Sequence, residues 1–303
     1  MDGVRFCILL ARAFFSIAFS FGLFGEKVRV ASFNLQNYLI MDRVVDGKWR
    51  KNYPKPEKEK RALRSILKQV DAAVVAIQEI GERPFLNELW MDLNVTKGPV
   101  YPHAIWMPAG DPEEVRHLAL FSKIPFSSIN MHHDIDFPYF DGRKTPDRGV
   151  LEVTFNSNGI KWKLFNLHLK SKWTERKDDP DASIRREREA RAIRDYLRKS
   201  NPPESNSHYL IVGDFNDHRN SSTLRRFLQV NDTPLTSMVP CEDSRGHRWT
   251  HHWSKADSYS RFDYILATPL MLKKLVVGSA KIVDGPNSVL ASDHRMIYAD
   301  FQF

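Results

Sequence analysis

The sequence predicts an α/β (α+β) protein built as a four-layer αββα sandwich, in which two mainly antiparallel sheets pack face to face with helices outside. Three observations support this fold class. Short runs with strand-like patterning are numerous, amphipathic helical segments are few and well spaced, and no long Gly/Ser/Pro linker divides the chain. The 303 residues are enough for one large domain with its own core.

The first half of the chain contains strands, two helices and then more strands. Residues 27–34 alternate and stop at Asn34, which predicts the first strand. Apolar residues at helical spacing predict an amphipathic helix over residues 56–70. The continuous apolar run 72–77 predicts a strand covered on both faces, and Glu79 follows it. The remaining elements are a helix over 85–93 and strands over 103–107, 117–121 and 127–131.

The second half begins with a predicted β-hairpin. Residues 149–155 and 161–168 flank an Asn-Ser-Asn-Gly turn, which is typical of a hairpin. A charged helix is predicted over residues 183–199. The apolar run 209–212 predicts a buried strand whose end carries Gly-Asp-Phe-Asn. The remaining elements are a helix over 223–230 and strands over 248–253, 261–266 and 296–301.

The N-terminal segment has the layout of a secretory signal peptide. Residues 6–24 are mostly apolar and follow Arg5. Arg12 interrupts the apolar run and no Ala-x-Ala site follows, so an uncleaved anchor stays open. Residues 1–25 are therefore assigned to a signal peptide or membrane anchor and residues 26–303 to the folded domain. The predicted location is secreted, periplasmic or in the cell envelope.

Charge and cysteine content restrict the classes of partner. Lys and Arg outnumber Asp and Glu by 45 to 37, and a basic surface attracts polyanions such as nucleic acid or anionic headgroups. Cys7 lies in the N-terminal segment, so a processed chain keeps only Cys241 and has no internal disulfide framework. We expect a monomer that binds nucleic acid as substrate, with lipid or inositol phosphate as the alternative. No feature of the sequence indicates a protein partner.

Polar side chains recur at or beside the ends of the predicted strands. They are Asn34, Glu79, Asn166, His168, Asp214, Asn216, Asp263, Asp293 and His294. Asp214 and Asn216 are two residues apart, as are Asn166 and His168, so in extended chain each pair points to one side. Any single one is readily explained as a turn former or a solvated side chain. Together they supply carboxylate oxygens for a divalent cation, amides for a phosphate and a His with an orienting Asp.

Six peptides in this order make the chain resemble the endonuclease/exonuclease/phosphatase superfamily, which includes deoxyribonuclease I, abasic-site endonucleases, sphingomyelinases and inositol-polyphosphate 5-phosphatases. The peptides are Ser32-Phe33-Asn34-Leu35-Gln36-Asn37, Ile77-Gln78-Glu79, Asn166-Leu167-His168, Gly213-Asp214-Phe215-Asn216, Phe262-Asp263-Tyr264 and Ser292-Asp293-His294. They span nearly all of the chain after the N-terminal segment. The resemblance implies hydrolysis of a phosphate ester by metal-assisted in-line attack of water.

The resemblance also implies how the metal and the water are held. Glu79 would bind Mg²⁺ or Mn²⁺ directly, with Asn34 and Asp293 close by. Mg²⁺ suits such a site because it binds through few carboxylates and keeps waters for the substrate. Asp214 would orient and deprotonate the attacking water.

The remaining residues would act on the phosphate. By the same resemblance, His294, held by Asp263, would donate to a nonbridging phosphate oxygen or act as the acid–base partner. Asn166, His168 and Asn216 would bind the scissile phosphate, and His168 would belong to the catalytic set. Such donors gain strength as charge develops in the transition state.

The chain departs from the family pattern at a few positions. Phe33 replaces the Trp often found before the Asn. His168 places the chain in the branch with Asn-x-His, which disfavours abasic-site repair. Lys170 and Lys172 follow His168 and would bind a second phosphate or anionic headgroup, unless they are ordinary solvated lysines.

The leading hypothesis is a metal-dependent phosphodiesterase that acts as a nuclease. The basic balance, Trp249 and Trp253 suit a nucleic-acid backbone and stacked bases. A sphingomyelinase-like or inositol-phosphate hydrolase would use the same chemistry, and a long apolar loop that would favour it is absent outside the N-terminus. A catalytically inactive binding module is the third hypothesis, and the presence of Asp214, His294 and Glu79 argues against it.

Overall fold

The structure is a computed structural model that describes residues 25–95, 100–202 and 206–303. The predicted signal peptide or anchor over residues 1–25 lies, except for its last residue, outside the described residues and stays a prediction. Within the described residues, no helix is both long and apolar enough to cross a membrane.

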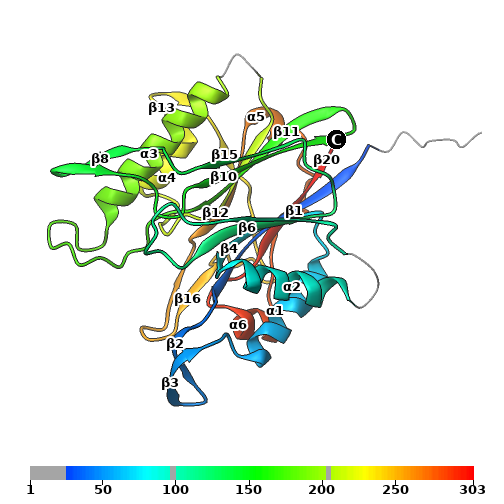
Figure 1. Ribbon diagram of the computed structural model, residues 1–303. Coiled ribbons are helices and arrows are strands. Elements are labelled where there is room, and N and C mark those ends of the chain that lie inside the picture. The colour runs from blue at the N-terminus through cyan, green and yellow to red at the C-terminus, as the bar shows by residue number, and fades with distance from the viewer. Residues whose placement is uncertain (1–24, 96–99, 203–205) are drawn as a thin grey trace, which may run out of the picture.

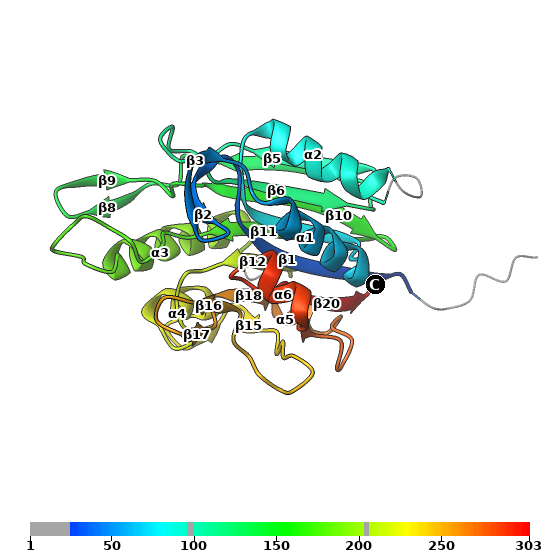
Figure 2. The same ribbon diagram turned by 90° about the horizontal axis from the view of Figure 1, so that it is seen from below.

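Two six-stranded sheets form the centre of the molecule (Figures 1 and 2). The first has the order β19-β20-β1-β4-β6-β5 and is formed by β1 (Lys27–Tyr38), β4 (Val74–Ile80), β5 (His103–Met107), β6 (His117–Ser122), β19 (Lys281–Ile282) and β20 (Ile297–Gln302). The second has the order β15-β18-β12-β11-β10-β7 and is formed by β7 (Ser128–His132), β10 (Val150–Ser157), β11 (Ile160–His168), β12 (Tyr209–Asp214), β15 (Ser237–Met238) and β18 (Asp263–Ala267). The pairs β1–β4 and β11–β12 are parallel and the other pairs in both sheets are antiparallel. The predicted mainly antiparallel sheets are confirmed.

Helices cover the two outer faces. Three of them pack on the first sheet, namely α1 (Glu57–Val70), α2 (Arg83–Asn94) and α6 (Pro286–Ala291). Two others, α3 (Ser183–Ser200) and α4 (Ser222–Leu228), pack on the second sheet, and the short α5 (Pro269–Leu272) follows β18. A third apolar cluster fills the space between the sheets. The predicted four-layer αββα sandwich is confirmed.

The alternation of side chains along the strands produces these layers. In β1, Val28 and Val30 belong to the cluster between the sheets, whereas Ala31 and Phe33 belong to the cluster under the outer helices. A central strand is therefore apolar on both faces, as its sequence predicts. Each fully buried aliphatic or aromatic side chain contributes roughly 1.5–3 kcal/mol to folding.

Several hairpins were not predicted. They are β2 (Met41–Val45) with β3 (Lys48–Tyr53), β8 (Phe137–Tyr139) with β9 (Gly142–Lys144), and β13 (Gln229–Val230) with β14 (Thr233–Pro234). A strand predicted over 248–253 is shorter, because only β16 (His251–Trp253) pairs with β17 (Ser258–Ser260). The β2–β3 hairpin stands away from the core and needs no apolar face, so no apolar alternation marks it, and the β8–β9 and β13–β14 hairpins are too short for periodicity to reveal.

Asn166 joins the two sheets in their interior. Its Nδ2 donates to the carbonyl oxygens of Ile77 at 3.0 Å and Ala119 at 3.1 Å, and its Oδ1 accepts from Nε2 of Gln78 at 2.6 Å. These bonds run from β11 in the second sheet to β4 and β6 in the first. The Asn166→Ala variant should lose roughly 2–3 kcal/mol of unfolding free energy in denaturant titrations, because buried polar groups lose their partners.

A control for this prediction is Asn156→Ala, which removes an exposed amide from β10 and should leave the unfolding free energy within about 0.5 kcal/mol. The kcat of the folded Asn166→Ala protein separates structure from catalysis. An unchanged stability together with a large fall in kcat would contradict the structural role of this residue.

Candidate active site

Strand register brings three of the predicted site residues into one row. His168 at the end of β11 lies opposite Asp214 at the end of β12, and Asp214 lies opposite Asp263 at the start of β18. All three are almost fully buried. Neighbouring strands are about 5 Å apart, so the row places an imidazole and two carboxylates within reach of one another.

A close approach of two strands makes this row possible. Gly213 has φ 134°, and a Cβ on it would lie 2.0 Å from the carbonyl oxygen of Leu167 on β11. Any larger residue would push β11 and β12 apart at the point where His168 and Asp214 pair. The glycine of the Gly-Asp-Phe-Asn peptide is therefore required by packing.

The first sheet contributes Glu79 and Asn34. Glu79 has φ 60° and lies where the register of β4 shifts against both neighbouring strands, which is a β-bulge. Its Oε2 accepts the backbone N–H of Asn37 at 2.9 Å. The Asn34 Nδ2 donates to Oε1 of Glu79 at 3.2 Å and to Oδ2 of Asp214 at 3.0 Å. One amide therefore connects the carboxylates of the two sheets.

Asp214 stands at the centre of the cluster. Its Oδ2 is 3.6 Å from Nε2 of His168 and 3.7 Å from Nε2 of His294. The backbone N–H of Asn216 donates to Oδ1 at 2.8 Å, and Nδ2 of Asn216 donates to Oδ2 at 3.2 Å. Asn216 adopts φ 51°, a left-handed conformation that Asn tolerates and that lets its amide turn back.

Asp263 holds His294 from the side opposite to Asp214. Nδ1 of His294 is 2.8 Å from Oδ2 of Asp263, while Nε2 faces Asp214. His251, which sequence reasoning did not select, stacks on Phe262 and lies beside the ring of His294, with centroids 4.7 Å apart. Its Nε2 is 3.8 Å from Oδ2 of Asp293. No pattern in the sequence sets this histidine apart from its neighbours.

Burial and charge shift the pKa values in this cluster. Burial, together with the Asp263 and Glu79 carboxylates, raises the pKa of Asp214 to about 7 against the opposing effects of His294 and the hydrogen bond from the Asn216 backbone. Burial opposes the charge of His294, but Asp263 and Asp214 outweigh it and hold the pKa of His294 well above its usual value. Burial, together with nearby cations, lowers the pKa of His168 well below its usual value. His294 is thus the cationic imidazole and His168 the neutral one at pH 7.

The donor set fits a divalent cation. Ligand atoms of Glu79, His168 and Asp214 all lie within 4.8 Å of one another, and those of His251, Asp293 and His294 form a neighbouring group. Oδ1 of Asp263 and Nδ1 of His168 are buried without a hydrogen-bond partner in the described part of the chain. Carboxylate oxygens with an amide beside them are the hard donors that Mg²⁺ and Mn²⁺ accept. The predicted ligands Glu79, Asn34 and Asp293 lie in this region, and their role as ligands stays a prediction.

Two arginines that were not predicted from the sequence, Arg148 and Arg116, lie near His168. Arg148 is almost fully buried, and its Nε and Nη1 have no hydrogen-bond partner among the described residues. Its Nη2 pairs with Glu114, which also pairs with Arg116 at 3.1 Å. Both guanidinium groups lower the pKa of His168. They come from the loops before β10 and β6, and only the fold shows that they meet.

Three residues that the sequence analysis assigned to phosphate or headgroup binding, Asn166, Lys170 and Lys172, have other partners in the structure. The amide of Asn166 is used between the sheets, so these contacts give no support to its predicted role in phosphate binding, which stays a prediction. Nζ of Lys170 donates to the carbonyl oxygen of Trp173 at 2.7 Å. Nζ of Lys172 lies 3.2 Å from Nε2 of His218 near the rim.

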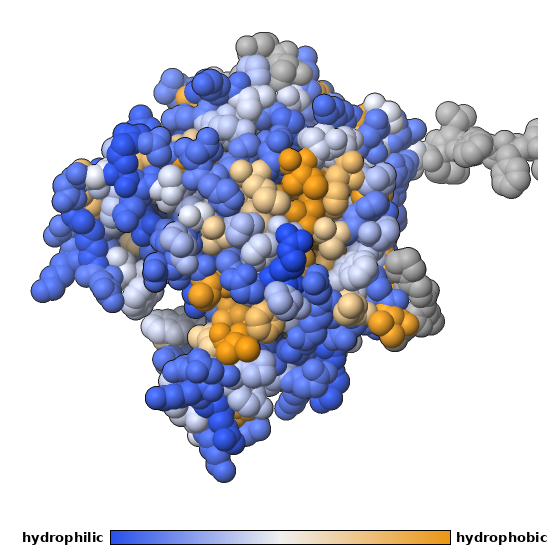
Figure 3. All heavy atoms as spheres, viewed as in Figure 1, coloured by the Kyte–Doolittle hydropathy of each residue, from blue (hydrophilic) through white to orange (hydrophobic). Residues whose placement is uncertain are grey.

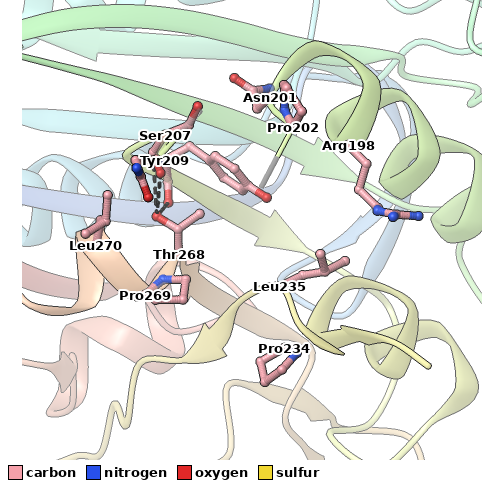
Figure 4. Close-up of a pocket in the computed structure, with 11 residues that line it drawn as sticks. Arg198, Asn201, Pro202, Ser207, Tyr209, Pro234, Leu235, Thr268, Pro269 and Leu270 are labelled. Carbon is pink, nitrogen blue, oxygen red and sulfur yellow. Dashed lines mark hydrogen bonds between the residues drawn. The ribbon is translucent and has the colours of Figure 1, made fainter. Parts of the chain in front are cut away.

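A separate cavity lies at the other end of the second sheet (Figure 4). It is lined by Arg198, Asn201, Pro202, Asn206, Ser207, Tyr209, Pro234, Leu235, Thr268, Pro269 and Leu270. Tyr209 begins β12, whereas Asp214 ends it. The cavity is therefore distinct from the cluster around Asp214.

The αββα sandwich and its buried cluster of carboxylates and imidazoles are the features of a hydrolase with this fold. The chain belongs to the endonuclease/exonuclease/phosphatase family, because the model of that family matches residues 31–294. The recognition made from the six peptides is confirmed. A search of the curated proteins by sequence found no match.

Solved structures share the fold at low sequence identity. The human Nocturnin catalytic domain with bound sulfate anion is 16% identical, with a TM-score of 0.63 over 91% of this chain and 94% of that one. Truncated TDP2 from Caenorhabditis elegans is 15% identical, with a TM-score of 0.59 over 91% and 98%. Sphingomyelinase C from Streptomyces griseocarneus is 14% identical, with a TM-score of 0.59 over 91% and 100%. These likenesses establish the fold.

Proposed function

We propose that the protein is a divalent-metal-dependent phosphodiesterase that cleaves nucleic acid by in-line attack of a water activated by Asp214. The observation that carries the proposal is the position of the Asp214 carboxylate. It is buried where the two sheets meet, with imidazole nitrogens at 3.6 and 3.7 Å and the Asn34 amide at 3.0 Å. A carboxylate held in this way can orient a water and take its proton.

The other residues of the cluster have complementary roles. A Mg²⁺ or Mn²⁺ ion held by Glu79, with Asn34 and Asp293 beside it, would supply charge neutralisation at the phosphate. His294, kept protonated by Asp263, donates to a nonbridging phosphate oxygen through Nε2, because Nδ1 is already bound at 2.8 Å. Donors that are fixed before the reaction stabilise the developing charge without reorganisation.

Two nitrogens of the Arg148 guanidinium support a phosphate as the substrate group. Its Nη2 pairs with Glu114, but Nε and Nη1 are buried without a partner among the described residues and can bind an anion, and Arg116 pairs with the same Glu114. Arg148 is also near enough to His168 to lower the pKa of that imidazole. We therefore assign phosphate binding to Arg148 and His168. The Nδ2 of Asn216 already donates to Leu169 and Asp214, so its role in phosphate binding stays a prediction.

The pKa of Asp214 sets the expected dependence on pH. The base must be deprotonated, so kcat/KM should rise with pH through the region of its pKa of about 7. A cation bound nearby would favour the charged form of Asp214 and lower its pKa. The rise in kcat/KM would then occur at lower pH. His294 stays protonated as the pH rises, because its pKa is raised. A pH profile of kcat/KM in which the rate falls continuously from acid to neutral pH would contradict Asp214 as the base.

Nucleic acid is favoured over lipid by the surface of the described residues. The chain is basic, and Trp173 and Trp253 are exposed. Nζ of Lys170 lies 5.8 Å from the centre of the Trp173 ring, and an exposed aromatic side chain beside a cation suits a stacked base beside a phosphate backbone. Export, which the N-terminal segment predicts, is part of this proposal and is tested by cell fractionation.

A substrate panel tests the proposal. Duplex DNA, single-stranded DNA, RNA, sphingomyelin, inositol phosphates and bis-p-nitrophenyl phosphate are incubated with the protein and Mg²⁺, with Asp214→Asn as the inactive control. We expect cleavage of nucleic acid that weakens steeply as salt is raised, because bound phosphates release counterions. If the protein cleaved only sphingomyelin or only inositol phosphates, the nuclease proposal would be wrong and the protein would be a lipid or inositol-phosphate hydrolase.

A further inference from the structure

The β2–β3 hairpin, residues 41–53 and here called the arm, projects from the body of the protein (Figure 1). It forms its own two-stranded sheet, and all six residues of β3 are exposed. A two-stranded hairpin is marginally stable by itself in water. Its exposed side chains therefore add nothing to the core, and their composition points to a contact outside this chain.

The far half of the arm carries cations around the exposed Trp49, and the other exposed apolar side chains of the arm are Val44 and Tyr53. Lys48, Arg50 and Lys51 have no ion pair with any residue in the described ranges, and Trp49 between them is 62% exposed. Because side chains alternate along a strand, Lys48 and Arg50 lie on one face and Trp49 and Lys51 on the other. Figure 3 shows the corresponding projection as predominantly hydrophilic.

The root of the arm is attached to the turn that supports Glu79. The Arg43 guanidinium donates to the carbonyl oxygens of Tyr53 at 3.1 Å, Asn37 at 3.1 Å and Leu39 at 2.9 Å. Asn37 is in the left-handed region with φ 56°, and its N–H donates to Glu79 at 2.9 Å. One residue of the arm thus holds the backbone that orients a candidate metal ligand.

A buried lysine just after the arm makes a second attachment. Nζ of Lys55 donates to the carbonyl oxygen of Gln36 at 3.2 Å and pairs with Glu59 at 3.0 Å. The side chain of Gln36 accepts the backbone N–H of Asp293 at 3.0 Å. The root of the arm is therefore fixed beside the site. In Figure 2 the arm and the β16–β17 hairpin lie on either side of β12.

We propose that the arm binds the phosphate backbone of a nucleic-acid strand outside the scissile bond, with Lys48, Arg50 and Lys51 on phosphates and Trp49 against a base. This inference rests on the proposed function and extends it to the substrate flanks. Cations neutralise phosphates and an exposed indole stacks on bases of any sequence. A hairpin that inserts into a membrane would have an apolar tip, whereas this tip is Asp46-Gly47.

The test compares two triple variants of the full chain, each of which removes three exposed positive charges. The arm variant is K48Q/R50Q/K51Q. The control variant is K161Q/K199Q/K273Q, from the start of β11, the end of α3 and the residue after α5, all far along the chain from the arm and exposed. Binding of a fluorescent single-stranded oligonucleotide is measured with Asp214→Asn added, so that no cleavage occurs, and turnover of oligonucleotide and bis-p-nitrophenyl phosphate is measured without it.

We expect the arm variant to bind the oligonucleotide at least about 10-fold more weakly at low salt, with a log–log salt slope reduced by about 2–3. Trp49→Ala should also weaken binding, and the loss of turnover should be larger for the oligonucleotide than for bis-p-nitrophenyl phosphate. Equal weakening in the two triple variants would reduce the effect to net charge and overturn the inference.

Failure of the inference and failure of the proposed function give different results. If the arm variant binds the oligonucleotide as well as wild type does, and wild type still cleaves nucleic acid, only the inference about the arm is wrong. An oligonucleotide that is neither bound nor cleaved by the wild-type chain overturns both. Binding to anionic phospholipid vesicles that the arm variant loses, with oligonucleotide binding retained, assigns the arm to a membrane and overturns the inference.

Discussion

Asp214→Asn is expected to lower kcat at least about 100-fold, because the amide cannot accept a proton from water. Asn has nearly the same shape, and with its carbonyl oxygen in the place of Oδ2 it still accepts from the side-chain amides of Asn34 and Asn216, while the bond from the backbone N–H of Asn216 to Oδ1 is lost. The variant should therefore keep its fold while it loses the base. His294→Ala should cause a loss of similar size, because it removes the donor that Asp263 holds at 2.8 Å from its Oδ2.

The measurement is single-turnover and steady-state hydrolysis with Mg²⁺, with thermal unfolding as the check on folding. Asp232→Asn, which changes an exposed aspartate outside the cluster, is the matched control and should retain full activity. The double variant D214N/H294A should lose much less than the product of the two single losses, because residues that act as a unit are not additive. Near-normal rates in either single variant would remove that residue from the mechanism.

Removal of divalent metal should abolish hydrolysis, and the Glu79→Gln variant should bind Mn²⁺ more than about 10-fold more weakly than wild type. Loss of a residue that hydrogen-bonds to a metal ligand typically lowers metal affinity about 10–100-fold. Removing the charge of the ligand itself should therefore lower the affinity by more than about 10-fold. The Gln carbonyl oxygen can still accept the backbone N–H of Asn37, as Oε2 does in wild type, although the bond from Asn34 to Oε1 is then lost. We therefore expect the bulge that presents residue 79 to persist.

Two readouts separate metal binding from catalysis. Mn²⁺ affinity is measured by titration calorimetry, and a metal-dependent rise in Tm should appear in wild type and shrink in Glu79→Gln, because a ligand that binds only the native state stabilises it. Glu113→Gln, at an exposed carboxylate in the loop before β6, is the control and should behave as wild type. Full activity in excess EDTA would exclude a metal from the reaction.

The long strands and helices of the core were predicted, whereas the short core elements β15, β19, α5 and α6 and the projecting hairpins were not. Residues 27–34, 72–77 and 209–212 were predicted as strands; β1 and β12 contain the first and the last, and β4 overlaps the second from Val74 onward. Residues 41–53 were left unassigned, because a hairpin with polar side chains on both faces has no apolar alternation. The strand before Glu79 was predicted to end at residue 77, but the bulge extends β4 to Ile80 and turns this carboxylate into the site.

The candidate site was predicted as a set of residues at strand ends, and its geometry was not. His168 and Asn166 share a face of β11, as the period of a strand requires, yet the first lies beside Asp214 and the second is used up between the sheets. Arg148 reaches the cluster from a loop, and His251 reaches it from a stretch that was predicted as a strand but in which nothing in the sequence marked this histidine. The different surroundings of His168 and Asn166 depend on where each lies along β11. The approach of Arg148 and His251 depends on contacts between segments that are distant in the chain.

The sequence by itself determined the fold class, the strand-end positions of the polar residues and the family, because hydrophobic periodicity and short peptides are local properties of the chain. Only the tertiary structure decided that Asn34 connects Glu79 to Asp214, that Asp263 holds His294 and that Arg148 faces the cluster with free N–H groups. Strand register and sheet packing set these distances, and both arise from contacts between residues that are far apart in the chain.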